Sequence, residues 1–181
     1  MSKPFLGAAA LAALLLAAPA CKRQKVHVVE TVEETPQQPS AQLASMVRMG
    51  DPTMASQLAG GFYDIEAGAW RWTARKFAVN LRPPEHAAGQ GAVLELHLTV
   101  PPPSIAKLGG ITLSASIGGT ALAPETYSKA GEYTYRRDVP ANLLAGAAVR
   151  IDFQLDKAMP PGDGDKRELG VVASSVALVS K

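Results

Sequence analysis

The alternation of apolar and polar residues is the strongest signal in the chain, and it begins after Gly61. Leucine and valine at positions 94, 96, 98 and 100 alternate with polar residues, and the prolines 101–103 end this segment because proline offers no backbone N–H to a sheet. Comparable segments lie at 62–66, 77–81, 111–117, 133–139, 149–155 and 169–179. The pattern predicts about seven or eight half-buried antiparallel strands separated by Gly- and Pro-rich turns.

Short strands in this number predict a mainly β domain over residues 61–181, built as an antiparallel two-sheet sandwich. Jelly-roll and immunoglobulin-like strand orders fit the pattern equally well, and a small closed barrel is the alternative architecture.

The segment 41–60 has a different period, because its apolar residues fall three and four positions apart. This spacing predicts one or two short helices that lead into the β domain. Asp51-Pro52 provides a start signal for the second helix, and Gly60-Gly61 provides a stop signal. The apolar residues are Leu43, Met46, Val47, Met54 and Leu58.

The first twenty residues have the features of a signal peptide. Lys3 precedes an apolar stretch of fourteen residues, Phe5 to Ala18, which is shorter than the roughly 20 residues of a membrane-spanning helix. Small residues then lead to Cys21, the only cysteine of the chain. A single cysteine cannot form an internal disulfide.

The segment Leu16-Ala17-Ala18-Pro19-Ala20-Cys21 resembles the bacterial lipobox. The resemblance implies cleavage before Cys21 and attachment of acyl chains such as palmitate to it, which would anchor the protein to a membrane of the bacterial envelope. It also favours the outer membrane, because the residue after the cysteine is lysine rather than aspartate. Residues 21–40 are polar and Pro-containing and are expected to form a flexible tether.

Charge and composition exclude several classes of function. The chain has 18 basic and 16 acidic residues, so no nucleic-acid-binding face is expected. No nucleophile elbow, phosphate loop or dinucleotide motif occurs, and His27, His86 and His97 are too isolated to form a metal site. We therefore expect no cofactor, no metal and no catalytic residue, and a protein that is not an enzyme.

A hydrolase on the sandwich is the least favoured alternative. It would need two facing carboxylates, for which Asp64, Glu66 and Glu168 are the candidates, and each has a simpler explanation as an ion-pair partner of Arg71, Arg75 or Arg167. The segment Asp163-Gly164-Asp165 offers too few oxygen ligands for calcium and is expected to be a turn.

Three motifs stand out, namely the segments from Gly61 to Glu66, from Trp70 to Thr73 and from Asp165 to Gly170. Together they resemble a bacterial β-sandwich module that occurs in small envelope proteins and beside membrane enzymes of surface-polysaccharide assembly. The resemblance spans residues 51–181 and implies a glycan context.

The residues of these motifs are also the candidate ligand-binding site. Trp70 and Trp72 share a strand face, where their rings could cover the apolar side of a sugar while Arg71 and nearby carboxylates hold its hydroxyls. The alternative is that both rings belong to the core and that Arg71 forms an ion pair with Glu66 or Asp165. The candidate residues are Glu66, Trp70, Arg71, Trp72, Asp165, Arg167 and Glu168.

Two functions remain open from the sequence. The first is a non-catalytic envelope lipoprotein that binds or organises carbohydrate. The second is a structural module that contacts another envelope protein, which predicts an exposed apolar patch around Met46, Met49 and Met54.

Overall fold

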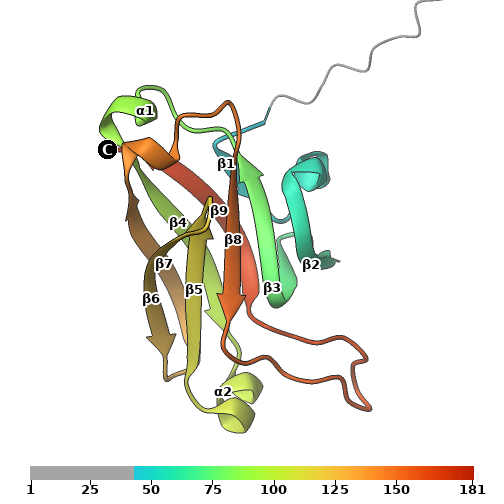
Figure 1. Ribbon diagram of the computed structural model, residues 1–181. Helices are drawn as coiled ribbons and strands as arrows, with labels where there is room; N and C mark the ends of the chain where they lie inside the picture. Colours follow the sequence, from blue (N-terminus) through green and yellow to red (C-terminus); the bar gives the residue numbers. More distant parts are fainter. Residues whose placement is uncertain (1–42) are drawn as a thin grey trace, which may run out of the picture. The chain divides into compact units, whose positions relative to one another are not determined.

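The computed structural model describes residues 43–181. The predicted signal peptide, Cys21 and the predicted tether lie outside the described residues. Within the described part, nine strands and four short helices follow one another along the chain (Figure 1).

The strands are β1 (Met46–Arg48), β2 (Leu58–Glu66), β3 (Trp70–Leu81), β4 (Ala92–Val100), β5 (Ile111–Ile117), β6 (Thr120–Tyr127), β7 (Gly131–Val139), β8 (Val149–Leu155) and β9 (Val172–Ser180). The helices are η1 (Pro52–Gln57), α1 (Ala87–Gln90), α2 (Pro102–Leu108) and η2 (Ala141–Leu143), of which η1 and η2 are 3₁₀ helices.

All strand pairs are antiparallel, which confirms the predicted fold class at the level of a mainly β antiparallel domain. The two separate sheets of the prediction are instead joined into one hydrogen-bonded path, β6-β5-β8-β3-β9-β4-β7. The join is made by β3, which pairs with β9 at Arg71 and Trp72 and with β8 from Lys76 to Leu81. A single long strand therefore belongs to both faces of the fold.

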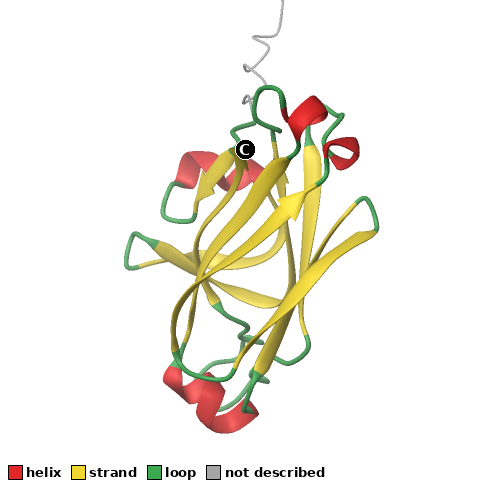
Figure 2. Cartoon of the chain, turned by 90° about the vertical axis from the view of Figure 1, so that its left-hand side faces the viewer, coloured by secondary structure: helices red, strands yellow, loops and turns green. Residues whose placement is uncertain are grey.

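The two ends of this path, β6 and β7, are linked by side chains rather than by a backbone ladder. The Tyr135 hydroxyl donates to the Ala123 carbonyl at 2.8 Å, and the Arg137 guanidinium donates to the carbonyls of Ala123 at 2.6 Å and Pro124 at 2.9 Å. The sheet thus rolls around its core, as Figure 2 shows, and combines features of the predicted sandwich and of the alternative barrel.

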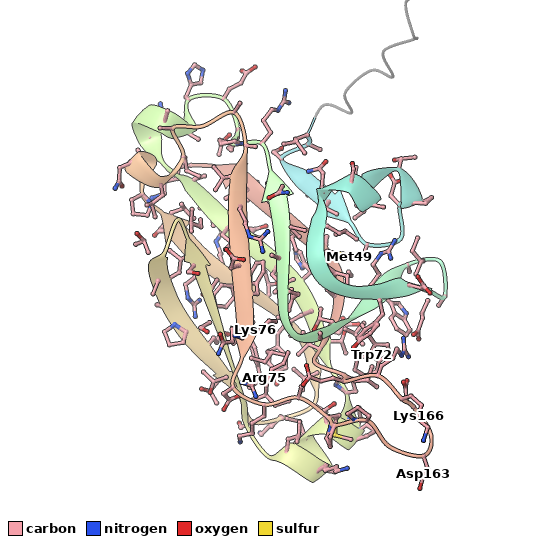
Figure 3. The ribbon with its side chains drawn as sticks, turned by 45° about the vertical axis from the view of Figure 1, so that its right-hand side comes forward. Met49, Trp72, Arg75, Lys76, Asp163 and Lys166 are labelled. Carbon is pink, nitrogen blue, oxygen red and sulfur yellow. The ribbon has the colours of Figure 1, made fainter. Side chains whose placement is uncertain are left out.

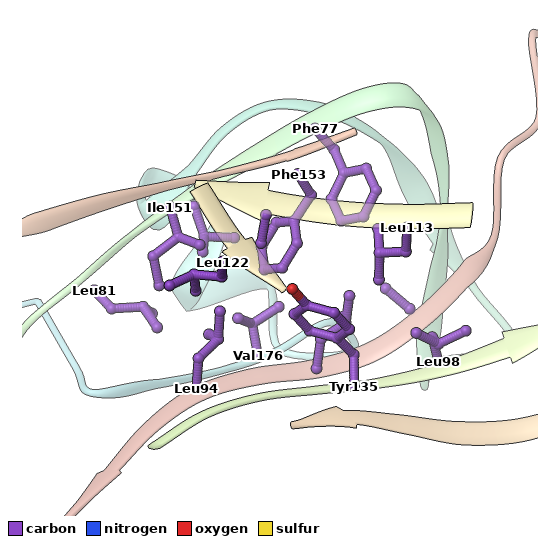
Figure 4. Packing of buried hydrophobic residues seen from close by; sticks show 14 of the residues in the cluster. Phe77, Leu81, Leu94, Leu98, Leu113, Leu122, Tyr135, Ile151, Phe153 and Val176 are labelled. Carbon is purple, nitrogen blue, oxygen red and sulfur yellow. The ribbon is translucent and has the colours of Figure 1, made fainter. Parts of the chain in front are cut away.

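The core confirms the predicted alternation. Leu94, Leu96, Leu98 and Val100 are at most 2% exposed, whereas the residues between them point outward. The rings of Phe77 on β3 and Phe153 on β8 stack with centroids 4.9 Å apart (Figure 4). Each buried aromatic ring contributes a few kcal/mol of hydrophobic stabilisation, so this contact holds β3 firmly on β8.

The lead-in differs from the prediction, and the first expected helix is wrong. Residues 46–48 form β1, which pairs with residues 175–177 of β9, and this pairing buries Val47 fully in the core. The residues that made the period of three and four differ in burial, since Val47 is fully buried, Met46 is exposed, and Leu43, Met54 and Leu58 are half-buried.

The second expected helix exists but is short. It begins as predicted, with the Asp51 carboxylate accepting from the Thr53 backbone N–H at 2.9 Å. It ends at Gln57, before the predicted stop at Gly60-Gly61, because the Gln57 amide is buried in hydrogen bonds to Ala44 and Asn80 and the next residues enter β2. Among the described residues, 43–60 contribute β1, η1 and the start of β2 to the sheet.

Candidate functional site

The three sequence motifs meet in space around Arg167. Its guanidinium contacts Glu66 at 2.8 Å and Asp165 at 2.7 Å, and it lies over the ring of Tyr63 with 5.1 Å to the centroid. All three charged side chains are about one-third exposed. Arg167 thus joins the end of β2 to the loop that precedes β9.

The loop is fastened further by backbone contacts to β3. Gly170 N–H donates to the Thr73 carbonyl at 2.6 Å, and Val171 N–H donates to the Thr73 hydroxyl at 3.1 Å. The Glu168 carboxylate accepts from the Arg75 backbone N–H at 2.9 Å, and its carbonyl accepts from the Tyr63 hydroxyl at 2.8 Å. We call this set of contacts between residues 165–171 and the β2–β3 hairpin the clasp.

The predicted ion pair of Arg71 with Glu66 or Asp165 is wrong. Arg71 donates instead to the carbonyls of Met49 at 3.0 Å and Tyr63 at 2.8 Å. Glu66 and Asp165 take Arg167 as their partner, because the loop brings that guanidinium between them. The expected ion pair of Glu66 with an arginine is confirmed, and Glu168 is held by a backbone N–H.

The clasp favours the ionised form of the Asp165 carboxylate. Hydrogen bonds from the Arg167 side chain and backbone lower the pKa of Asp165 to about 2, and the same contacts raise the pKa of Arg167 above its already high value. A permanently ionised carboxylate cannot act as a general acid near neutral pH. The arrangement suits fixed structural charge.

The two tryptophans are neither core residues nor fully exposed. Trp70 and Trp72 are both half-buried, and their rings meet edge to face with centroids 6.4 Å apart and planes at 82°. The clasp lies next to both rings, because two of its residues belong to the same hairpin. Glu66 pairs with Trp70, and Thr73, which pairs with Phe62, follows Trp72 directly. The hairpin therefore positions both rings.

Trp70 lines a groove of about 360 Å³ on the outer face of β9, β4 and β7. Polar side chains from these strands line the groove with it: His97, Thr99, Glu132, Thr134 and Ser174. The His97 Nδ1 lies 3.1 Å from the Thr134 hydroxyl, and the Ser174 hydroxyl donates to the His97 carbonyl at 3.3 Å. We call this groove the tryptophan groove.

Sequence reasoning missed these polar residues as members of a site. Its only signal was their place at the polar positions of the alternating strands, which did identify His97 as an outward residue. Their convergence depends on β4 pairing with both β7 and β9, a strand order that the pattern does not encode.

A second groove, of about 530 Å³, lies on the outer face of β3, β8 and β5. Lys76, Ser114, Ser116 and Gln154 line it, together with the ion pair of Arg150 and Asp152 at 2.8 Å. The aromatic residues at its floor, Phe77 and Phe153, are only 3% and 2% exposed, so they offer no stacking surface. We call this the polar groove.

The Asp163-Gly164-Asp165 segment forms a turn at the tip of the loop between β8 and β9, where Figure 3 labels Asp163 and Lys166. Gly162 N–H donates to the Asp165 carbonyl at 2.8 Å, and the Asp165 carboxylate is taken by Arg167. Among residues 43–181, no group of three or more His, Cys, Asp or Glu is arranged to hold a metal ion.

The predicted apolar patch is wrong for the described part of the chain. Met49 is fully buried, Met54 packs against the core, and only Met46, at 39% exposed, reaches the surface as expected.

Within residues 43–181, no helix is both long and apolar enough to cross a membrane.

No protein-family description matches the sequence, and no curated protein sequence is significantly similar to it. Solved structures with a similar course of the chain include TmCBM27, a carbohydrate-binding module with specific mannan recognition, at 14% identity and a TM-score of 0.46 over 77% of this chain and 97% of that one. A carbohydrate-binding module described as CBM4 is 12% identical, with a TM-score of 0.37 over 75% of this chain and 85% of that one.

Dimeric latent PorU from Porphyromonas gingivalis is 15% identical with a TM-score of 0.36, over 57% of this chain and 10% of that one. Similarity at this level assigns the chain to no family.

Proposed function

We propose that the chain is a lipoprotein of the bacterial envelope whose β domain binds carbohydrate in the tryptophan groove without acting on it chemically. The observation that carries the proposal is the half-buried ring of Trp70 in a groove that Leu98, Tyr133 and Val172 also line and whose polar side chains offer hydroxyl, imidazole and carboxylate groups. A sugar presents an apolar face to an aromatic ring and hydroxyl groups to such polar side chains.

The remaining residues of the predicted site act indirectly in this proposal. The donors of Arg71 and Arg167 are engaged by carbonyls and carboxylates of the chain itself, and Glu66, Asp165 and Glu168 hold the clasp. These residues position the hairpin that carries Trp70 and Trp72. The edge-to-face contact between the two rings restrains the Trp70 ring before any ligand binds, which lowers the entropic cost of binding.

The envelope location rests on the lipobox resemblance at Cys21 and on the short apolar stretch before it. Two or three acyl chains on Cys21 would hold the protein stably at a membrane, with the outer membrane favoured. In that position the β domain would face glycans of the envelope at high local concentration, which favours a weak, exposed binding groove.

The chain offers a direct test because it contains only two tryptophans. In the full chain purified in detergent micelles, Trp72→Phe leaves Trp70 as the sole emitter, and Trp70→Phe leaves Trp72 as the matched control. Both variants are titrated with the hexasaccharides of chitin, cellulose, mannan and xylan while emission and acrylamide quenching are recorded.

We expect one hexasaccharide to shift the Trp70 emission and to protect it from acrylamide in a saturable manner. The Trp70→Phe variant should bind that sugar about fivefold more weakly, because the smaller ring loses about 1 kcal/mol of stacking free energy. Unchanged quenching of Trp70 at saturating concentrations of all four sugars would refute the proposal and favour a structural module.

A further inference from the structure

A third groove adjoins the tryptophan groove. It has a volume of about 570 Å³ and is lined by Met46 and Arg48 of β1, by Gly68 and Ala69 of the β2–β3 turn, and by Ser174 and Ser175 of β9. We call it the β1 groove. Each of the two grooves is by itself in the size range of a small-molecule site, about 300–1,000 Å³.

The two grooves meet at Ser174, which lines both of them. β3 pairs with β9 through Arg71 with Ala173 and Trp72 with Val172, and continuing this register by one residue places Trp70 beside Ser174. Ala69, in the wall of the β1 groove, is the residue before Trp70. Trp70 therefore lies beside the junction, on the side of the tryptophan groove.

We propose that the tryptophan groove and the β1 groove form one channel that takes an internal stretch of a linear polysaccharide rather than the end of a chain. This inference rests on the proposed function and specifies its ligand. The channel crosses β7, β4, β9 and β1, and three spacings of about 4.8 Å between neighbouring strands give a path of about 14 Å. That length accommodates several sugar rings in a row.

The floor of the channel carries polar side chains along the path of a polymer. Thr99, Thr134, Ser174 and Ser175 offer hydroxyl groups there, and the imidazole of His97 lies between Thr134 on β7 and Ser175 on β9. Glu132 lies at one end and Arg48 at the other, both exposed, and neither has an ion-pair partner among residues 43–181. Their polar groups are therefore available to hydroxyl groups of a bound chain at both ends.

The first test blocks the channel at its centre. The full chain in nonionic detergent is run by electrophoresis through native gels that contain glycol chitin, hydroxyethylcellulose, galactomannan or soluble xylan. Ser174→Trp fills the junction with a ring, and Ser116→Trp is the matched control because it places the same ring at an outward serine of the polar groove. Thermal melts verify that both variants fold.

We expect one polymer to retard the wild-type chain, Ser174→Trp to weaken that retardation at least tenfold and Ser116→Trp to leave it unchanged. Loss of retardation only in Ser116→Trp would place the ligand in the polar groove and overturn the inference. Absence of retardation of the wild-type chain by every polymer would remove the proposed function itself.

The second test measures the dependence on chain length. The oligosaccharides of the retarding polymer, from two to six units, are titrated into the wild-type chain and into Arg48→Ala and Thr134→Ala, which remove contacts on opposite sides of Trp70. We expect the affinity to rise at least tenfold from two to six units, and both variants to weaken the binding of the hexamer more than that of the dimer.

Equal affinity for dimer and hexamer, with no effect of Arg48→Ala, would overturn the channel while leaving carbohydrate binding at Trp70 intact. The two experiments therefore distinguish loss of the channel from loss of carbohydrate binding as a whole.

Discussion

At the scale of single residues, two buried tyrosines on neighbouring strands differ in one hydrogen bond. The hydroxyl of Tyr127 is buried and has no hydrogen-bond partner among the described residues, and burial raises its pKa above the ordinary value of about 10. The hydroxyl of Tyr135 donates to the Ala123 carbonyl at 2.8 Å, and its ring lies 4.2 Å below the Arg137 guanidinium. The same functional group thus has opposite energetic consequences at the two sites.

We expect Tyr127→Phe to leave the free energy of unfolding unchanged or to raise it by up to about 1 kcal/mol, because it removes an unpaired buried hydroxyl. Tyr135→Phe should lower it by about 1 kcal/mol, because the hydrogen bond from the hydroxyl to the Ala123 carbonyl is lost and only Arg137 still donates to that carbonyl. Urea unfolding of the two variants and the wild-type chain measures both effects. An equal loss of stability in both variants would show that Tyr127 has a partner in solution.

The Asp165 carboxylate predicts a specific dependence of stability on pH. Its pKa in the folded chain is about 2, below the ordinary value near 3.9, because Arg167 donates hydrogen bonds to it. Because the pKa is lower in the folded state, the ionised carboxylate stabilises the fold fully when the pH is above the unfolded-state pKa. This stabilisation disappears as the pH falls from about 4 through 2. The contribution is small because the carboxylate is about one-third exposed.

The pH dependence is measured by urea unfolding between pH 5 and 2 in the wild-type chain and in Asp165→Asn. We expect the stability difference between the two to be greatest at pH 5 and to shrink toward pH 2. A difference that stays constant with pH would mean that the Asp165 side chain acts through its shape rather than its charge.

At the scale of elements, the clasp depends on close approach of the loop to β3 at Gly170. A Cβ atom at this position would lie 2.6 Å from the Thr73 hydroxyl oxygen, 2.7 Å from a methyl carbon of Leu155 and 2.8 Å from the Ala74 carbonyl oxygen. The glycine is therefore required by space, and the loop can donate its backbone N–H groups to Thr73 only without a side chain there.

We expect Gly170→Ala to lower the free energy of unfolding by about 1–3 kcal/mol, the usual cost of overpacking a buried site. Gly164→Ala, in the same loop, is the matched control, since nothing lies within 4 Å of its Cβ position. Thermal melts give the stability of both, and the emission of Trp70 and Trp72 reports whether the hairpin moves. Equal melting temperatures of Gly170→Ala and the wild-type chain would contradict the close packing of the clasp.

At the scale of the whole molecule, β3 connects the clasp, the sheet and the proposed channel. β3 belongs to both faces of the rolled sheet, and the tryptophans lie in its first residues, which pair with β9 before the strand moves on to β8. A ligand in the channel would contact β7, β4, β9 and β1 together. The channel is thus framed by strands rather than by long loops, which favours a preformed site.

The attachment of the chain to a membrane is predicted from the apolar stretch Phe5 to Ala18 and the lipobox resemblance at Cys21, which lie outside the described residues. We expect the full chain, expressed in a bacterium with lipoprotein processing, to sediment with membranes and to carry acyl chains on Cys21 in mass spectra. Cys21→Ser should appear in the soluble fraction or retain its signal peptide. Lipidation would be contradicted if both proteins sedimented equally and their mass spectra showed no acyl chains on either.

Local periodicity determined much of this protein without a structure. The alternation from residue 94 to 100 predicted which side chains are buried, and Asp51-Pro52 predicted the start of η1, because these features depend on neighbours along the chain. The three motifs of the candidate site were identified from sequence, and the fold does bring them together around Arg167.

Only the tertiary structure decided the strand order, the partners of Arg71 and Arg167, and the strand character of residues 46–48. It also decided that Trp70 faces His97, Thr134 and Ser174, which come from three other strands. Alternation states which face of a strand is polar, but the pairing of strands distant in sequence determines whose polar faces meet, and that pairing follows from packing of the whole core.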